Sequence, residues 1–143
     1  MSVGIPTYNR PKDLRAALEC ITKQTYTNLE IIVSDNCSPG EETEEVVRGF
    51  MKKDPRVFYY RQPENHGAVF NMNFVLEQSC GEYFMWAADD DMFKKDFISL
   101  CLDRFISEPG LMAVTTEAQY FSEEKQFEYF AEGVPYYTFA SEN

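Results

Sequence analysis

Apolar runs and amphipathic stretches alternate along most of the chain. The first run, residues 3–5, is ended by Pro6 and predicts a short buried strand that stops at a loop. Pro11 suits the first turn of a helix. The apolar positions after it lie one helical turn apart, at Leu14, Ala17, Leu18 and Ile21. The chain is therefore expected to begin with a strand, a polar loop and a helix.

The same unit recurs downstream. Further apolar runs predict strands at 29–33, 57–60, 83–86 and 111–115. Helical spacing predicts one helix that carries Val46, Val47, Phe50 and Met51, a second over 68–78, and a third that carries Phe97, Ile98, Cys101 and Phe105. Strands that alternate with helices of ~10–15 residues indicate a parallel sheet. We therefore expect an α/β fold, a Rossmann-like, mostly parallel sheet with helices on both faces, in which residues 83–86 form a buried strand.

The polar loops of these units are expected to meet. Ligands of parallel α/β sheets lie beyond the carboxyl ends of the strands. The loops 7–10, 35–38 and 89–91 each follow a predicted strand, so they should share one edge of the sheet. Residues 1–119 are expected to form this α/β domain. Residues 120–143 are rich in aromatic and glutamate side chains without a clear period, and we expect a different region to begin there.

The composition limits the class of protein. The chain has 143 residues, one domain's length, and 44% of them are hydrophobic, which is enough for a core. The sequence shows no transmembrane stretch, no signal peptide and no CxxC pair among its four cysteines. We therefore expect a cytoplasmic protein with reduced thiols. Any attachment to a membrane is expected through parts of a longer protein. The formal charge of −11 argues against nucleic acid as a partner. A phosphorylated ligand would need a metal, an arginine or a helix N-terminus.

Three consecutive aspartates, Asp89, Asp90 and Asp91, follow the fourth apolar run. Adjacent carboxylates repel one another, and a site that gathers them commonly holds a cation. Mg²⁺ and Mn²⁺ take oxygen ligands, and Mg²⁺ uses one or two carboxylates with substrate phosphates. On an extended segment Asp89 and Asp91 would face one ligand. The alternative is a solvated acidic turn that caps the next helix. An EF-hand is excluded, because Phe93 and Lys94 stand where it needs Asp or Asn and then Gly.

Two other loops carry candidate ligand contacts. Asp35 could accept the ring N–H of uracil, thymine or guanine, or it could start an Asx turn with Asn36. Thr7 and Tyr8 could form a wall for a base and Arg10 a fork for phosphate, or their loop could simply cap the first helix.

The segment 65–67 precedes the third predicted helix. Gly67 permits a close backbone approach, and a helix N-terminus favours phosphate, although a plain turn would use the same residues. His66 is the only histidine, which excludes a metal site built on several histidines, while a general-base role for it stays open.

Taken together, these blocks resemble the family 2 glycosyltransferases of the GT-A fold. The resemblance lies in residues 3–10, in residues 24–38, in 65–67 together with Asn73, and in 81–83 leading to the three aspartates. It covers roughly residues 2–118. It implies that the α/β domain is the nucleotide-sugar-binding half of a GT-A enzyme, and that residues 120–143 begin the acceptor side.

The resemblance also implies roles for the matched residues. Thr7 and Asp35 would contact the base and ribose side of the donor, Arg10 would lie near its phosphates, and Asp89 and Asp91 would bind Mn²⁺ or Mg²⁺ at the diphosphate. The residues expected at the donor are Pro6, Thr7, Tyr8, Arg10, Asp35, Asn36, Gly67, Asn73, Asp89 and Asp90. The implied activity is metal-assisted transfer with inversion, from a nucleoside-diphosphate sugar, UDP being expected, to a hydroxyl of a saccharide or lipid-linked acceptor in polysaccharide biosynthesis.

Two features depart from the family pattern. The family commonly has two acids and a glycine where this chain has Asp35, Asn36 and Cys37, which weakens the expected ribose contact. Its catalytic base lies well beyond the aspartates, so the base is expected after Asn143 and the chain is expected to be part of a longer enzyme. A sheet edge or aromatic surface left open by that truncation could support a homodimer.

Two other functions stay open. A nucleotide-sugar-binding module without activity would use the same residues. A nucleotidyltransferase would open on a Gly-rich phosphate loop, which residues 6–10 are not.

Overall fold

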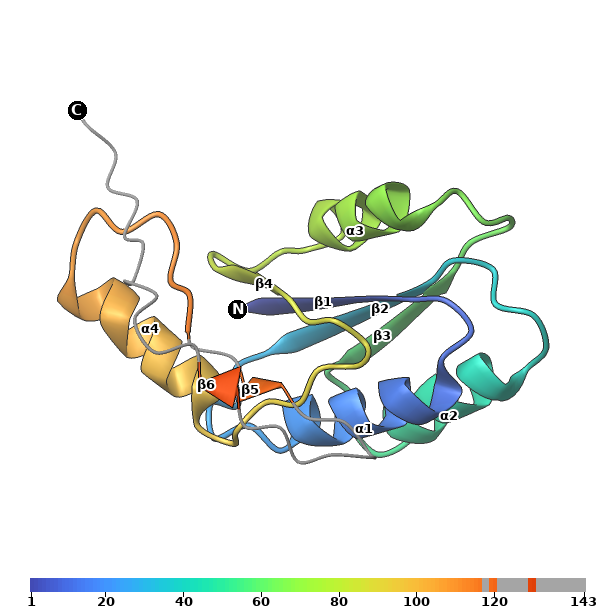
Figure 1. The fold of residues 1–143 in the computed structure, drawn as a ribbon, viewed down its shortest axis with the longest axis horizontal. Helices are drawn as coiled ribbons and strands as arrows, with labels where there is room; N and C mark the ends of the chain where they lie inside the picture. Colours follow the sequence, from blue (N-terminus) through green and yellow to red (C-terminus); the bar gives the residue numbers. More distant parts are fainter. Residues whose placement is uncertain (117–118, 121–128, 131–143) are drawn as a thin grey trace. The chain divides into compact units, whose positions relative to one another are not determined.

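The computed structural model describes residues 1–116, 119–120 and 129–130. These described residues divide into two units, the first being Met1–Phe97 and the second beginning at Ile98. The elements follow one another as shown in Figure 1. They are β1 (Ser2–Thr7), α1 (Pro11–Thr22), β2 (Glu30–Asp35), α2 (Glu42–Met51), β3 (Val57–Arg61), α3 (Ala68–Glu77), β4 (Phe84–Trp86), α4 (Phe97–Ser107), β5 (Gln119–Tyr120) and β6 (Tyr129–Phe130). In the second unit β5 pairs with β6 in antiparallel fashion. The domain boundary expected near residue 119 stays a prediction.

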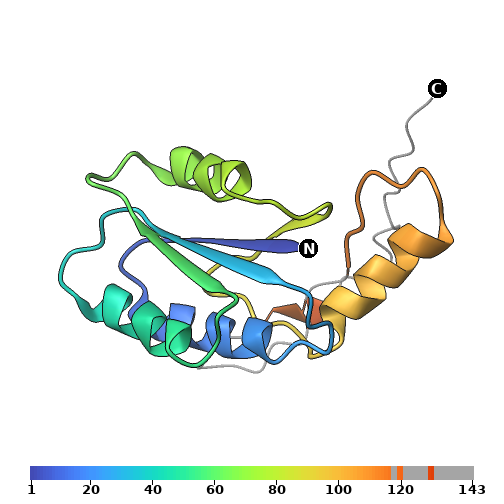
Figure 2. The same ribbon diagram turned by 180° about the vertical axis from the view of Figure 1, so that it is seen from behind.

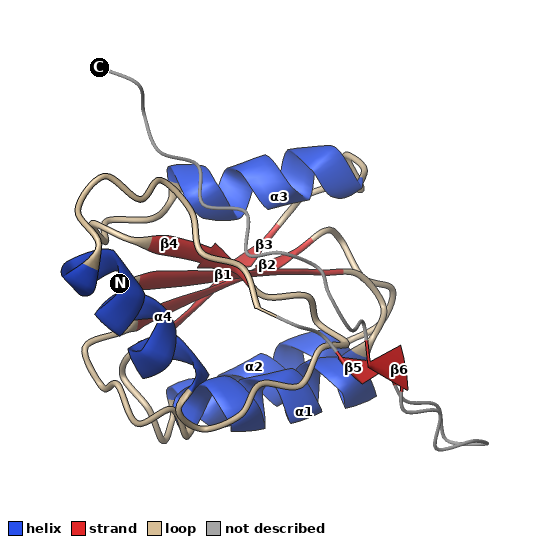
Figure 3. Cartoon of the chain, turned by 60° about the vertical axis from the view of Figure 1, so that its left-hand side comes forward, coloured by secondary structure: helices blue, strands red, loops and turns tan. Residues whose placement is uncertain are grey.

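The first unit is a parallel four-stranded sheet between two layers of helices. Its strand order is β3-β2-β1-β4. Helices α1 and α2 lie on one face and α3 lies on the other, an arrangement that is clear in Figures 2 and 3. The expected α/β, Rossmann-like fold with helices on both faces is therefore confirmed. Among the described residues, no helix combines the length and the apolar character that a membrane span requires.

The core forms where the apolar pattern placed it. The stripe of α1 and the apolar residues of β1 and β2 are buried against one another. Val46 and Val47 of α2 are buried as well, whereas Met51 is exposed. Gly4 of β1 is required by close packing, because a Cβ there would lie 2.7 Å from a methyl group of Val75 and 2.7 Å from the ring of Phe84. All four cysteines, at 20, 37, 80 and 101, are free.

Pro6 does not end the first strand as predicted, since β1 continues to Thr7. The N–H of Ser2 and the carbonyl of Gly4 bond the β4 side, whereas the carbonyl of Thr7 accepts from Asn36 on the β2 side. The backbone groups of successive residues of β1 thus face the two neighbouring strands in turn, so the nitrogen of Pro6 faces the β4 side. At this position the pairing of β1 with β4 has already ended, since it stops at Gly4 and Trp86. The missing N–H of Pro6 therefore removes no ladder bond.

Two other expectations about strands are corrected. The 83–86 run is not a fully buried strand: β4 has three residues, of which Phe84 and Met85 are partly exposed and Trp86 is 46% exposed. The reason is its place at the end of the strand order, with β1 as its one neighbour in that sheet. The run 111–115 forms no strand beyond an isolated bridge at Leu111, because an apolar run becomes a strand only where a ladder partner is available.

Glu30 ties together the starts of three strands. Its Oε1 accepts a hydrogen bond from the Ser2 hydroxyl and from the N–H groups of Cys80 (2.6 Å) and Gly81 (3.1 Å), just ahead of β4. Partial burial acts to raise the pKa of the Glu30 carboxyl, but these hydrogen bonds outweigh it, so that its pKa lies below the ordinary value. The ionised form of Glu30 is therefore the one that stabilises the fold.

We expect Glu30→Gln to lower the free energy of unfolding by about 1–2 kcal/mol at neutral pH, because a charge-assisted acceptor is lost. The pKa of Glu30 is lower in the folded state, so its contribution is complete above the unfolded-state pKa and is lost as the pH falls through the folded-state value. Urea unfolding of both proteins at neutral and acid pH measures the difference, which should shrink in acid. Glu77→Gln, at the exposed end of α3, is the matched control and should have little effect at either pH. A Glu30→Gln effect of the same size at every pH would contradict this assignment.

Candidate functional site

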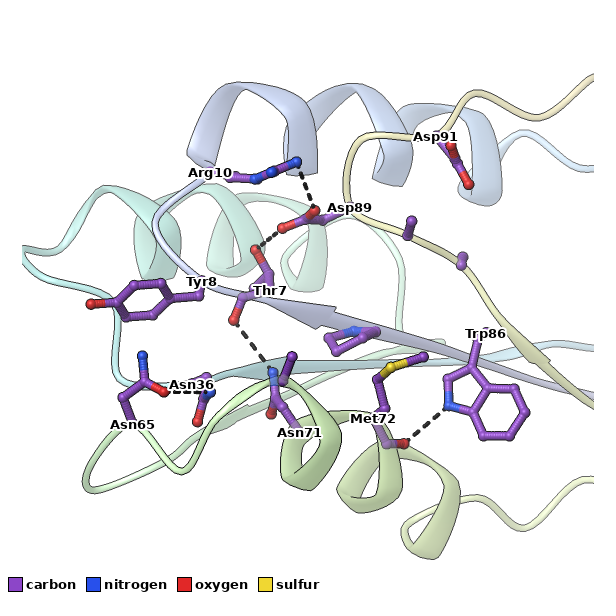
Figure 4. A pocket seen from close by; sticks show the side chains of 14 residues that line it. Thr7, Tyr8, Arg10, Asn36, Asn65, Asn71, Met72, Trp86, Asp89 and Asp91 are labelled. Carbon is purple, nitrogen blue, oxygen red and sulfur yellow. Dashed lines mark hydrogen bonds and ion pairs between the residues drawn. The ribbon is translucent and has the colours of Figure 1, made fainter. Parts of the chain in front are cut away.

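A pocket of about 560 Å³ opens at the carboxyl ends of β1 and β4 (Figure 4). The strand order reverses between these two strands, because β2 and β3 extend the sheet on one side of β1 and β4 lies on the other. Such switch points are where open α/β sheets bind ligands, since the flanking loops diverge there. The pocket is lined by Pro6, Thr7, Tyr8, Arg10, Asn36, Asn65, Ala68, Asn71, Met72, Trp86, Ala87, Ala88, Asp89 and Asp91.

Asp89 is the carboxylate held most firmly in this pocket. It is 8% exposed, and its Oδ2 accepts a 2.6 Å hydrogen bond from the hydroxyl of Thr7, at the end of β1. Burial raises the pKa of Asp89 above its ordinary value, although the Thr7 hydrogen bond and the charge of Arg10 act in the opposite direction. An ionised Asp89 is therefore costly in isolation and would gain from a nearby cation.

Arg10 supplies part of that positive charge. Its Nη1 lies 3.8 Å from Oδ1 of Asp89 and makes a closer ion pair with Asp90. Both Arg10 and Asp90 are about half exposed, at 49% and 50% of their side-chain surface, so this pair is solvated and contributes little to stability. Arg10 is therefore free to exchange Asp90 for another anion without a large cost.

Asp91 lines the pocket from a different direction. The segment after β4 is a turn, closed by a 3.3 Å hydrogen bond from the N–H of Asp91 to the carbonyl of Ala88, so it is not the extended segment assumed from the sequence. In Figure 4 the Asp91 side chain lies apart from that of Asp89. Within the described residues, no three or more acidic, histidine or cysteine side chains come together to form a complete metal site. Mg²⁺ keeps several waters and is bound by only one or two carboxylates together with phosphates, so an incomplete set of protein ligands does not conflict with such an ion.

Asn71 is a pocket residue that the sequence did not reveal. It is 2% exposed on α3, and its amide pairs with Ser34 of β2: Oδ1 accepts from the Ser34 hydroxyl at 2.5 Å, and Nδ2 donates to the Ser34 carbonyl at 2.8 Å. Nδ2 also lies 3.4 Å from the carbonyl of Thr7. Asn73, which was predicted instead, is exposed and lies outside the pocket lining. The available signal was the spacing of Asn71 and Val75, which places a polar residue on the buried face of α3.

Asp35 ends β2 and does not reach the pocket. It is fully buried, and both of its oxygens have partners: the N–H of Ser38 at 2.8 Å and the hydroxyl of Tyr59 at 2.9 Å. Burial, reinforced by the hydrogen bond to Asp35, raises the pKa of Tyr59 well above its ordinary value and keeps this phenol protonated. Asp35 thus holds the loop after β2 from inside.

That loop in turn supports the loop after β1. The hydroxyl of Ser38 accepts a 2.7 Å hydrogen bond from the N–H of Asn9, and the carbonyl of Ser38 accepts from Arg61 at 2.8 Å. Asn9 and Cys37 both have left-handed backbone angles, with φ of 55° and 64°. Non-glycine residues rarely adopt this conformation unless their surroundings impose it, and they are frequent near functional sites.

Asn36, next to Asp35, faces the pocket and holds its far rim. Its amide bonds the segment 65–67, with Nδ2 3.1 Å from the carbonyl of Gly67. Gly67 has φ of 85°, which glycine adopts without strain, and it adjoins the pocket without lining it. Asn65 lines the pocket from the segment 65–67, of which Gly67 was the residue expected at the donor. Met72 and Trp86 line it without having been predicted to do so, and the indole N–H of Trp86 donates to the carbonyl of Met72 at 3.0 Å.

The chain matches a known family along nearly its full length. The match, over residues 2–140, is to the family described as Glycosyl transferase family 2. Among curated proteins, a GalNAc(5)-diNAcBac-PP-undecaprenol beta-1,3-glucosyltransferase from Campylobacter jejuni is 35% identical over 105 residues, which are 73% of this chain and 34% of that protein. Glycosyltransferase GlyG from Streptococcus pneumoniae is 37% identical over 98 residues, 68% of this chain and 32% of that protein. The chain thus spans about a third of the length of these relatives.

Solved structures agree on the fold. A mannosyltransferase, PcManGT from Pyrobaculum calidifontis in complex with GDP-Man and Mn²⁺, superposes with a TM-score of 0.73 at 22% identity, over 83% of this chain and 35% of that one. S. aureus TarS 1-349 in complex with UDP-GlcNAc gives a TM-score of 0.69 at 21% identity, over 82% of this chain and 40% of that one. At these identities the likeness concerns the fold alone. The family match, which covers nearly all of the sequence, identifies the chain as a member of glycosyl transferase family 2.

Proposed function

We propose that the pocket binds the nucleotide-sugar donor of a glycosyltransferase, with UDP as its nucleotide. The observation that carries this proposal is that Asp89 and Asp91 line the same pocket as Tyr8 and Asn36. One cavity thus combines carboxylates for a cation with an aromatic and amide end that suits a base. The PcManGT complex contains GDP-Man and Mn²⁺, and the TarS complex contains UDP-GlcNAc, which supports this use of the fold.

Asp89 and Asp91 would hold Mn²⁺ or Mg²⁺, which when bound would offset the negative charge of the departing nucleoside diphosphate. The raised pKa of Asp89 fits this role, because a carboxylate that is costly when ionised in isolation gains most from a cation. Arg10 would exchange its exposed partner Asp90 for a phosphate oxygen. Tyr8, 46% exposed at the other end, offers a flat face to the base.

The reaction proposed is a direct displacement with inversion. An acceptor hydroxyl oxygen bonds to the anomeric carbon of the sugar while the bond from that carbon to the diphosphate oxygen breaks. The hydroxyl proton passes to a carboxylate base. We assign no residue of the described part of the chain to that role. By resemblance to the family, the acceptor would be a saccharide or a lipid-linked saccharide.

For Asp35 we propose a role that differs from the one expected from the sequence. Because both of its oxygens are engaged inside the protein, we propose that it supports the pocket through Ser38 and Asn9 and does not touch the base. The base would then meet Tyr8, Asn36 and Asn65, which line the pocket.

Asp89→Asn and Asp91→Asn should each weaken UDP binding in Mn²⁺ at least about tenfold, equivalent to about 1.4 kcal/mol, because a charged metal ligand is lost. Titration calorimetry of the 143-residue chain, with Mn²⁺ and with EDTA, measures this. EDTA should reduce the affinity of the wild type for UDP to that of the variants, and it should leave the affinity of the variants almost unchanged. Asn at position 89 keeps an acceptor for the Thr7 hydroxyl, so the folding of that variant should not suffer.

The matched control for this charge change is Glu19→Gln, on the exposed side of α1, which should bind UDP as the wild type does. GDP, ADP and UDP-sugars in the same titration define the preferred base. A folded wild-type chain that binds no nucleotide at any metal concentration would refute the proposed function.

Asp35→Ala should lower the free energy of unfolding by about 2–3 kcal/mol, because it leaves the Tyr59 hydroxyl and the Ser38 N–H unpaired. Tyr59→Phe, which removes one of these donors, should cost less, about 1 kcal/mol. Urea unfolding without nucleotide makes both measurements. If Asp35→Ala were as stable as the wild type but had lost UDP binding, Asp35 would be a direct ligand contact and its assigned supporting role would be wrong.

A further inference from the structure

β3 is the outer strand of the sheet on the side away from β4. Among the described residues it pairs with β2 alone. The carbonyl of Arg56 accepts a 2.8 Å hydrogen bond from the N–H of Ile31, so position 56 faces β2. The N–H of Gln62 donates to the carbonyl of Asp35 at 2.8 Å, so position 62 faces β2 as well. Because alternate residues of a strand direct their backbone groups to opposite sides, the N–H and the carbonyl of Tyr59 face outward, toward the position of a further strand.

Two aromatic side chains flank Tyr59 on the face of β3 that carries α3. Tyr60 is 36% exposed and contacts Phe74 of α3 edge to face, with ring centres 5.5 Å apart. Phe58 is 44% exposed and lies on the same face, since residues two apart in a strand point the same way. Edge strands that stay in solvent commonly carry lysine or other charged side chains that prevent pairing. The open face of β3 carries aromatic side chains in their place.

The arrangement around Tyr59 is complementary to itself. When two copies of β3 run antiparallel with the two Tyr59 residues opposite each other, the N–H of each Tyr59 meets the carbonyl of the other. Phe58 of each copy then lies opposite Tyr60 of the other, in the closer, non-hydrogen-bonded type of pair. Cross-strand aromatic pairs stabilise antiparallel strands, and the two-fold axis produces this pair twice.

The charges at the two ends of β3 are of opposite sign. Lys52 and Lys53, both exposed, precede the strand, and Glu64, whose side chain is 76% exposed, follows it. Asp54 also lies at the amino end, but it is engaged in a 2.7 Å ion pair with Arg56. An antiparallel partner brings the carboxyl end of one strand beside the amino end of the other. The lysines of each copy thereby come near the glutamate of its partner, which favours this orientation.

We propose that the outer edge of β3 is an interface with a second copy of this chain, in which the two sheets join through an antiparallel β3 pair centred on Tyr59. The two-fold symmetry closes the interface on itself, so it produces a dimer and not a filament. The pocket opens at β1 and β4, and β2 lies between these strands and the interface. The two pockets of the dimer therefore open toward opposite ends of the joined sheet. This proposal does not depend on the proposed function.

Sedimentation equilibrium of the 143-residue chain over a range of protein concentrations tests the interface. The mass of the wild type should rise with concentration from the 16.6 kDa of one chain toward twice that value. Phe58→Glu and Tyr60→Lys should each weaken association at least about tenfold, because each change acts twice across the axis. The double variant Phe58→Glu/Tyr60→Lys brings opposite charges face to face in the proposed register. It should therefore associate more tightly than either single variant.

Val69→Glu is the matched control for Phe58→Glu. It introduces the same charge at an apolar residue that is 74% exposed on α3, outside β3, and it should dimerise as the wild type does. Circular dichroism confirms that each variant is folded, and Tyr60→Lys serves if Phe58→Glu is not.

The results that would overturn the proposal are distinct from weak binding of nucleotide. A wild type that keeps the mass of one chain at every concentration, or whose mass rises beyond that of two chains, would exclude this dimer. Single variants that associate as the wild type does would exclude β3 as the interface. A folded double variant that associates no more tightly than the single variants would exclude the register centred on Tyr59.

Discussion

Thr7 is the residue on which the pocket depends. At the end of β1, its carbonyl accepts the N–H of Asn36 at 3.0 Å and faces the amide of Asn71 at 3.4 Å, while its hydroxyl donates to Asp89 at 2.6 Å. One residue thus connects the loop after β2, the helix α3 and the loop after β4. Because β1 lies between β2 and β4 and pairs with β2 along its whole length, Thr7 is held within the ladder of the sheet. Segments far apart in sequence converge there through hydrogen bonds to this one residue.

An anionic ligand, as proposed for this pocket, would have to bind despite the acidity of the chain. With a formal charge of −11, the protein repels a diphosphate at long range. Binding then has to come from local positive charge, and within the pocket lining Arg10 is the basic residue. Arg10 is itself occupied by Asp90 and Asp89. A divalent cation at Asp89 and Asp91 would offset the carboxylates and release Arg10 for the phosphates, so the two positive groups would act together.

Much of this architecture follows from local pattern. The spacing of Leu14, Ala17, Leu18 and Ile21 predicts α1, and the apolar runs predict the first four strands, because burial of one face is decided by neighbouring residues. The polar loops at the carboxyl ends follow from the parallel connection of strands. The features that could not be predicted depend on contacts between distant parts of the chain. Whether Asp35 faces inward or outward depends on Tyr59. Whether Asn71 or Asn73 faces the pocket depends on how α3 is rotated on the sheet. The absence of a strand at 111–115 likewise depends on a partner that local sequence does not specify.

Asp35 and Asn36 are adjacent in the sequence, but their side chains have different surroundings. Successive residues of a strand point to opposite sides, so when Asp35 turns inward to Tyr59, Asn36 is directed to the pocket. A carboxylate at position 36 would accept the N–H of His66 but could not donate to the carbonyl of Gly67 or to Asn65. The amide does both, and this fixes the oxygen of Asn65 and leaves its nitrogen for the pocket. At position 36 this chain has an amide where the family usually has a second acid. The amide fits the fold because the segment 65–67 offers one N–H donor and two oxygen acceptors to it. Asn36 thereby supports the rim of the pocket through three hydrogen bonds to the segment 65–67.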